Sequence, residues 1–295
     1  MDFGLVLPTM LPGACTEGIE AGAEAAERLG WSTVWVTDHL MVRRTEPEDE
    51  YARIFEALTT LAYVAGRHTS LRLGASAICL PLRNAVQTAK ELASLDALSG
   101  GRLVVALGVG DADDVGEFEN LGVAGRFHRR GAYVDEAIRL WRHLWSGSGE
   151  PFEGRFHAVR DFSFSPLPAQ GARLPIWTGG RSPAAYHRAG SLADGFHSSR
   201  FGPAEIAACL PHIRAAAEAA GRPMPAISVR VRLRFDGPAA KPFALAGSPA
   251  DMLADLRAFE GLGVGHVALV LNETSPEAVA AAAERFQRDV ISAMI

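Results

Sequence analysis

An aspartate and a histidine, Asp38 and His39, end the run Val34-Trp35-Val36-Thr37-Asp38-His39, in which they follow a predicted strand. Imidazole titrates near physiological pH, and an adjacent polar group can fix its tautomer. A histidine in this place could give or take the proton that accompanies a hydride transfer. A pair that only caps the next segment would have the same spacing, so the pair by itself leaves both interpretations open.

A glycine-rich turn with an arginine forms a second candidate site. Gly179, Gly180, Arg181 and Ser182 stand between a short apolar run and Pro183, which begins a predicted helix. Free N–H groups, the helix dipole and a guanidinium together favour binding of a phosphate. Ordinary capping explains Ser182-Pro183 alone, but the two glycines and Arg181 favour the phosphate interpretation.

An acidic loop follows the apolar run 103–107. Two glycines and four carboxylates gather there: Gly108, Gly110, Asp111, Asp113, Asp114 and Glu117. Glycine allows close approach to a ligand, so Gly110 is a candidate cofactor contact. Asp113 and Glu117 are candidate catalytic groups beside His39. A solvated acidic loop is the alternative for each, and no metal site is predicted, because the histidines are scattered and none forms His-x-His on the first strand.

Small residues occupy the third apolar run, Leu73-Gly74-Ala75-Ser76-Ala77-Ile78, where large branched residues would be usual. They suggest that something flat lies against the backbone near Ser76 and Ala77. A bulge that adjusts the curvature of a barrel is the alternative, and composition alone favours it.

The elements that must position these residues alternate between short apolar runs and longer segments of helical period, which is typical of βα units. Strands are predicted at 3–7, 33–37, 71–79, 103–107, 175–178, 195–198, 226–235 and 266–271. Eight βα pairs predict one (β/α)8 TIM barrel over residues 1–295, in preference to an open doubly wound sheet.

Four proline-marked starts support this phase of the helices, because proline costs little at a first helical position. They are Ser182-Pro183, Gly202-Pro203, Ser248-Pro249 and Ser275-Pro276. Residues 146–171 break the alternation and predict a small insertion after the fourth helix, with a strand pair at 151–156 and 162–164.

Composition narrows the class of partner. The net charge is −5 without a basic run, which argues against nucleic acid and favours a small-molecule substrate. Three distant cysteines indicate neither a disulfide framework nor a zinc site, so a reducing cytoplasm is expected. The sequence has no leader and no apolar run of about 18 residues, so neither export nor a membrane span is predicted.

Six motifs, taken in order, resemble the luciferase-like monooxygenase superfamily, and among its members most closely the coenzyme F-420 dependent oxidoreductases. They are Phe3-Gly4-Leu5, Thr37-Asp38-His39-Leu40, Pro81-Leu82-Arg83-Asn84, the run LDALSGGRL at 95–103, Gly108-Val109-Gly110 and the run PIWTGG at 175–180. The 95–103 run is the most specific, and its arginine and glycines look architectural.

The resemblance implies coenzyme F-420, a deazaflavin, or alternatively flavin mononucleotide (FMN), at the mouth of the barrel. It implies a non-prolyl cis peptide at Ser76-Ala77, contacts of Asp38 and His39 with the ring, and phosphate binding at 179–182. It also implies a homodimer.

The expected function is a hydride transfer between F-420 and a small organic substrate, by reduction of an activated C=C or C=N bond or oxidation of an alcohol. An FMN-dependent monooxygenase and a non-catalytic flavin-binding barrel are the alternatives. A sugar-phosphate substrate is not expected, because the phosphate-binding lysines of the sugar-phosphate dehydrogenases find little match in a chain with two lysines. The tryptophan that closely follows the histidine in those enzymes is also absent from 41–44.

Overall fold

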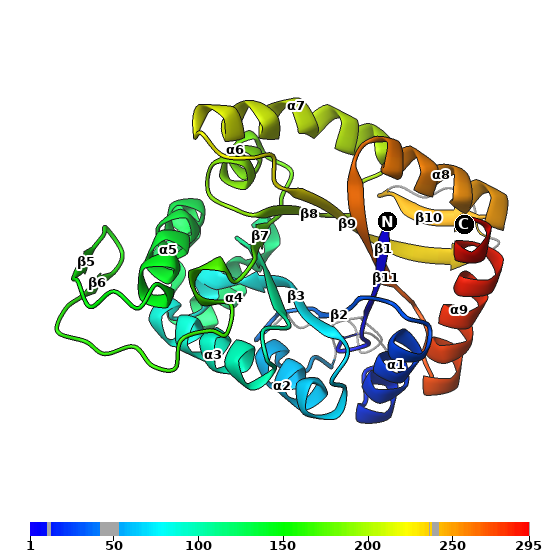
Figure 1. Ribbon diagram of the computed structural model, residues 1–295, viewed down its shortest axis with the longest axis horizontal. Coiled ribbons are helices and arrows are strands. Elements are labelled where there is room, and N and C mark those ends of the chain that lie inside the picture. Colours follow the sequence, from blue (N-terminus) through cyan, green and yellow to red (C-terminus); the bar gives the residue numbers. More distant parts are fainter. Residues whose placement is uncertain (11–12, 42–52, 236, 238–241, 295) are drawn as a thin grey trace.

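Within the described residues, eight parallel strands close into a barrel that helices surround on the outside (Figure 1). The computed structural model describes residues 1–10, 13–41, 53–235, 237 and 242–294. Closure comes from the pairing of β11 with β1 and of β9 with β8 and β11. The barrel strands, in spatial order, are β1 (Asp2–Val6), β2 (Thr33–Val36), β3 (Arg72–Cys79), β4 (Leu103–Gly108), β7 (Ile176–Thr178), β8 (Gly195–Ser199), β9 (Ala226–Phe235) and β11 (Val264–Val270). The predicted (β/α)8 barrel is confirmed.

Helices connect the strands around the outside of the barrel. They are α1 (Thr16–Arg28), α2 (Ala57–Arg67), α3 (Ala85–Leu98), α4 (Val115–Asn120), α5 (Arg130–Trp145), α6 (Pro183–Ser191), α7 (Pro203–Ala219), α8 (Pro249–Gly261) and α9 (Pro276–Asp289). The last four begin at the prolines that the sequence marked. Among the described residues, no helix combines the length and apolar character that a bilayer span requires.

One strand was not predicted. β10 (Ala244–Gly247) runs parallel to the far end of β9, with Ala244 opposite Arg232. The sequence predicts no strand between 235 and 248, a segment of which residues 236 and 238–241 lie outside the described part. Four residues are too few to show a strand period, so the pattern could not reveal it.

The insertion contains a strand pair, but its second strand lies elsewhere than predicted. β5 (Phe152–Glu153) pairs with β6 (Ala158–Val159), and residues 162–164 are not a strand. The carboxylate of Glu136 on α5 accepts N–H hydrogen bonds from Arg155, Phe156 and His157. These bonds fix residues 155–157 against α5. The hairpin therefore forms around this turn, earlier in the insertion than predicted.

Aromatic rings fill the axis of the barrel. Trp35 is fully buried there, and its indole Nε1 donates to Nε2 of His266 at 3.0 Å. A Cβ at Gly74 would lie 2.3 Å from the Trp35 ring, and one at Gly4 would lie 2.9 Å from its Nε1. The missing side chain at Gly74 therefore makes room for an indole of the protein itself.

The guanidinium of Arg102 joins two helix ends and the start of a strand, at the end of the barrel where the strands begin. It donates to the carbonyls of Ala65, His68, Leu71 and Ser99 at 2.6–2.9 Å. These carbonyls belong to the end of α2, to the entry of β3 and to the end of α3. The architectural interpretation of this arginine is confirmed.

A matched pair of glycine substitutions tests the axial packing. We expect Gly74→Ala to lower the free energy of unfolding by about 1–3 kcal/mol, because its Cβ would overlap the Trp35 ring. Gly66→Ala, in the last turn of α2 with open space around it, should leave stability unchanged or raise it by up to about 1 kcal/mol. Urea unfolding followed by Trp fluorescence measures both values. Equal stability of the two variants would contradict this account of the axis.

Candidate functional site

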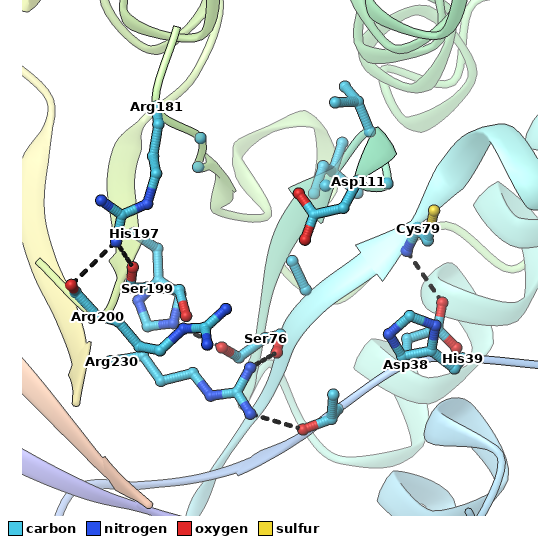
Figure 2. Close-up of a pocket in the computed structure, with 18 of the residues that line it drawn as sticks. Asp38, His39, Ser76, Cys79, Asp111, Arg181, His197, Ser199, Arg200 and Arg230 are labelled. Atoms are coloured by element: carbon cyan, nitrogen blue, oxygen red, sulfur yellow. Dashed lines mark hydrogen bonds between the residues drawn. The ribbon is translucent and has the colours of Figure 1, made fainter. Parts of the chain in front are cut away.

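A cavity of about 330 Å³ opens where the strands end at their carboxyl side. Residues from β2, β3, β4, β7, β8 and β9, or from the segments that follow them, line it (Figure 2). Barrel enzymes place their active sites at this end, because the loops there vary while the strands hold them rigidly. The predicted residues Asp38, His39, Ser76, Ala77, Gly110, Gly179, Gly180 and Arg181 all line this cavity.

The third strand forms one wall of the cavity through a bulge. β3 and β4 lose register between Ala75 and Ile78, and Ser76 and Ala77 face the cavity there. The peptide bond between Ser76 and Ala77 is cis, as the resemblance implied. Side chains this small leave the backbone accessible to a flat ligand.

The loop 179–182 forms a cradle of N–H groups at the start of α6. Gly180 has φ +131°, which favours glycine, and a Cβ there would lie 2.8 Å from Cβ of Ala185. The side chain of Ser182 accepts from N–H of Ala185 as the N-cap. Among the described residues, no hydrogen bond uses the N–H of Gly180, Arg181 or Ser182. These donors and the helix dipole suit an anion.

The guanidinium of Arg181 is tied to the next strand. Its Nη2 donates to the carbonyls of Ser199 and Arg200 at 2.8 and 2.9 Å (Figure 2). The guanidinium also lies over the ring of Phe201, 4.3 Å from the ring centroid. The arginine therefore adds positive charge beside the cradle and also fixes the loop after β8.

The imidazole of His39 is hydrogen-bonded to the buried carboxylate of Glu117. Nδ1 of His39 lies 3.1 Å from Oε2 of Glu117, whose Oε1 accepts the N–H groups of Leu40 and Met41 at 2.6 and 2.8 Å. Burial of His39 disfavours its charged form, but the hydrogen bond and charge of Glu117, with Asp114 and Asp38, outweigh it and raise the His39 pKa. Burial alone would raise the pKa of Glu117, but the hydrogen bonds that it accepts from His39, Met41 and Leu40 lower this pKa. Glu117 itself is buried and does not line the cavity, so it is linked to the cavity through His39.

The carboxylate of Asp38 is already engaged by the protein. It accepts from Nε and Nη2 of Arg83 at 3.1 and 2.5 Å and from N–H of Cys79 at 3.0 Å. Arg83 also pairs with Glu56 at 2.7 Å. Asp38 lines the cavity, but its carboxylate is used in these bonds, which fix the segment that carries His39.

In the acidic loop after β4, the carboxylates that face the cavity do not include the predicted Asp113. Asp113 is exposed and does not line the cavity, whereas Asp111 and Asp114 do. The short helical turn Ala112–Asp114 is closed by the bond from N–H of Asp111 to Asp114, and it turns Asp113 outward. The prediction that Asp113 lies beside His39 is therefore wrong, and of the carboxylates in this loop that line the cavity it is Asp114 that lies near His39.

Several lining residues were not predicted, among them Arg200, Arg230, Arg232 and His197. A signal was present, because Ser228, Arg230 and Arg232 alternate along β9 with the period of a strand. Polar residues at alternate positions of an otherwise apolar run mark the face that looks into the barrel mouth.

One group of side chains has the composition of a metal site. Ligand atoms of His39, Asp114 and Glu117 lie within 4.8 Å of one another. Both oxygens of Glu117 already accept hydrogen bonds from His39, Leu40 and Met41. The cluster is therefore explained by hydrogen bonding around His39.

Comparison with known proteins shows the family of the chain. The family model described as luciferase-like monooxygenase matches residues 1–285. An F-420-dependent glucose-6-phosphate dehydrogenase of Kineococcus radiotolerans is 30% identical over 222 residues, which cover 72% of this chain and 63% of that enzyme. An F-420-dependent hydroxymycolic acid dehydrogenase of Mycobacterium tuberculosis is 30% identical over 74% of this chain and 58% of that enzyme.

The fold is shared with solved structures. A monooxygenase from Streptomyces bottropensis superposes with a TM-score of 0.81 over all of both chains, at 22% identity. Because the family model spans nearly the whole barrel, including every strand that lines the cavity, the chain belongs to the luciferase-like monooxygenase family.

Proposed function

We propose that this protein is an F-420-dependent oxidoreductase that transfers a hydride between the deazaflavin and a small organic substrate. The observation that carries the proposal is one cavity with an N–H cradle for a phosphate on one side and His39, backed by Glu117, on the other. The relatives named as F-420-dependent enzymes support the choice of cofactor.

The residues present fit such a cofactor. The cradle at Gly180, Arg181 and Ser182 offers donors for a phosphate at the start of α6, where a side chain at position 180 would meet Ala185. The small side chains of Ser76 and Ala77 leave room for a flat ring against β3. The cradle would hold the phosphate, and the β3 bulge would support the ring.

When bound, a deazaflavin supplies a carbon that gives or accepts a hydride and reacts poorly with oxygen. A hydride added to C=C or C=N leaves an anion that needs a proton. The raised pKa of His39 keeps its imidazole protonated to higher pH, so His39 can donate that proton at the cavity wall. Glu117 holds the ring of His39 in one orientation, and Asp38 with Arg83 fixes the backbone that presents it.

The choice of cofactor is tested by titrating F-420 and FMN separately. We expect F-420 to bind more tightly. Gly180→Val should weaken binding at least about tenfold, because its side chain would displace the cradle from α6. Gly171→Val is the control, since Gly171 also has positive φ but lies outside the cavity lining. Tight binding of FMN without measurable F-420 affinity would overturn the cofactor choice. Unchanged affinity in a folded Gly180→Val variant would remove the phosphate role.

The proton role of His39 is tested with His39→Asn. General acid help is typically worth about 10²–10⁴-fold in rate, so the turnover number should fall strongly. Cofactor affinity should stay within a few fold, because the proposed cradle lies on the other side of the cavity. Steady-state oxidation of reduced F-420 measures the turnover number, and fluorescence titration of F-420 measures the affinity. A variant with the turnover and pH profile of the parent would show that His39 is not the acid, and Asp111 would be examined next.

The control of His39 by Glu117 is tested with Glu117→Gln. The amide oxygen can still accept from Leu40 and Met41, but the negative charge that favours the His39 cation is gone. The His39 pKa should fall, and the limb on which activity declines with rising pH should move to lower pH. Glu119→Gln, exposed on the same helix, is the control. A pH profile unchanged by Glu117→Gln would contradict this coupling.

A further inference from the structure

Ser76 lies where the strand ladder does not hold it. β2 pairs with β3 only as far as Ala75, and β4 pairs with Ala75 and then with Ile78. Ser76 and Ala77 both line the cavity without a partner in either ladder. Backbone that is not fixed by a ladder keeps one position only where other groups hold it. The shape of this wall therefore depends on side chains from other strands.

His197 and Arg230 provide those contacts from the far side of the barrel. Nε2 of His197 lies 2.7 Å from Oγ of Ser76, and Nη1 of Arg230 donates to the Ser76 carbonyl at 3.0 Å (Figure 2). Nδ1 of His197 lies 2.9 Å from Oγ of Ser228 on β9. Both ring nitrogens of His197 are thus used, and Ser76 is held at its hydroxyl and at its carbonyl.

The imidazole of His197 has little freedom to move. It stacks on Trp35 with 4.6 Å between ring centroids and an interplanar angle of 13°. Trp35 is in turn fixed by its hydrogen bond to His266. Rotation of the imidazole would break the stacking and both hydrogen bonds together. The rings at the barrel axis therefore fix the imidazole of His197, and this imidazole fixes the hydroxyl of Ser76.

The main chain of His197 also contacts the phosphate cradle. A Cβ at Gly179 would lie 2.4 Å from the carbonyl oxygen of His197, so only glycine allows this approach of β7 and β8. One residue touches the start of the cradle with its backbone and the β3 bulge with its side chain. Cradle and bulge are the two parts between which the proposed cofactor would lie.

We propose that His197, oriented by Ser228, is a positioning residue that fixes Ser76 and so sets the β3 wall relative to the cradle at 179–182. Its relevance to the cofactor rests on the proposed function. The clamp on Ser76 is a property of the protein alone.

A nucleophilic role for Ser76 is disfavoured by its surroundings. Ser76 and His197 have the separation of a nucleophile and its base. However, Nδ1 of His197 bonds to a hydroxyl, and among the described residues no carboxylate bonds to this imidazole. Burial, and then the charges of His266 and Arg230, hold the His197 pKa well below its ordinary value. The neutral ring is a poor base, so it holds Ser76 instead of activating it.

Hydrogen exchange of the cofactor-free protein tests the clamp. Backbone amides at 76–78 should exchange at least about tenfold faster in Ser228→Ala and in His197→Phe, since loss of one buried hydrogen bond corresponds to about that factor. His157→Phe removes a largely buried imidazole that bonds to Glu136 in the insertion and takes no part in the contacts at the barrel axis, and it should change these amides less than twofold. Ser228→Ala is the milder variant, which keeps the test open if His197→Phe does not fold.

Two results would overturn the proposal. One is unchanged exchange at 76–78 in both folded variants, or an equal increase in the control His157→Phe. The other is covalent labelling of Ser76 by a fluorophosphonate, which would show an activated nucleophile. In the loaded protein, Ser228→Ala should also raise the dissociation constant of F-420 by about tenfold. If neither F-420 nor FMN binds the parent protein, the proposed function fails, while the exchange result still decides the clamp.

Discussion

The packing of Trp35 at the barrel axis is the constraint on which the rest of the site depends. An indole fits there only because Gly4 and Gly74 on the neighbouring strands carry no side chain. The ring then provides a rigid face for the imidazole of His197, which reaches Ser76 in the bulge of β3. Close packing of this kind transmits position, because interiors contain few voids into which a ring can move. The floor of the cavity is thus set from inside the barrel.

Charge at the mouth is arranged on opposite walls. Arg181, Arg200, Arg230 and Arg232 lie on the side of β7 to β9, whereas the carboxylates lie on the side of β2 to β4. Two of the acids are partly neutralised by partners, Asp38 by Arg83 and Glu117 by His39. An anionic ligand is consequently favoured at the arginine wall, and a proton is retained at the opposite wall. This polarity suits a cofactor whose phosphate and reacting ring must lie at different ends of one cavity.

The barrel could be predicted from the sequence because its signals are local. Short apolar runs, helical periods and prolines after capping residues each depend on a few neighbouring residues, and the four proline-marked helices begin where expected. The glycine turn at 179–182 was also visible, since its chemistry lies in consecutive residues. β10 and the hairpin of the insertion were missed or misplaced because each is short and is fixed by contacts with distant segments.

Contacts between distant residues explain what the sequence did not reveal about the site. Glu117 stands 78 positions after His39, and only the fold shows that it supports the histidine. Asp113 differs from Asp111 and Asp114 in the direction of its side chain, which one short helical turn decides. His197 and Ser76 are 121 positions apart, and no local pattern relates them.

A crystal structure of the protein with F-420 is the most direct test of the central claim, that one cavity holds the cofactor between cradle and bulge. The account predicts the phosphate within hydrogen-bond distance of the N–H groups of Gly180, Arg181 and Ser182. It also predicts the deazaflavin ring against Ser76 and Ala77, with His39 at the cavity wall beside it. A ring bound away from the β3 bulge, or a phosphate without contact to the 179–182 loop, would contradict it.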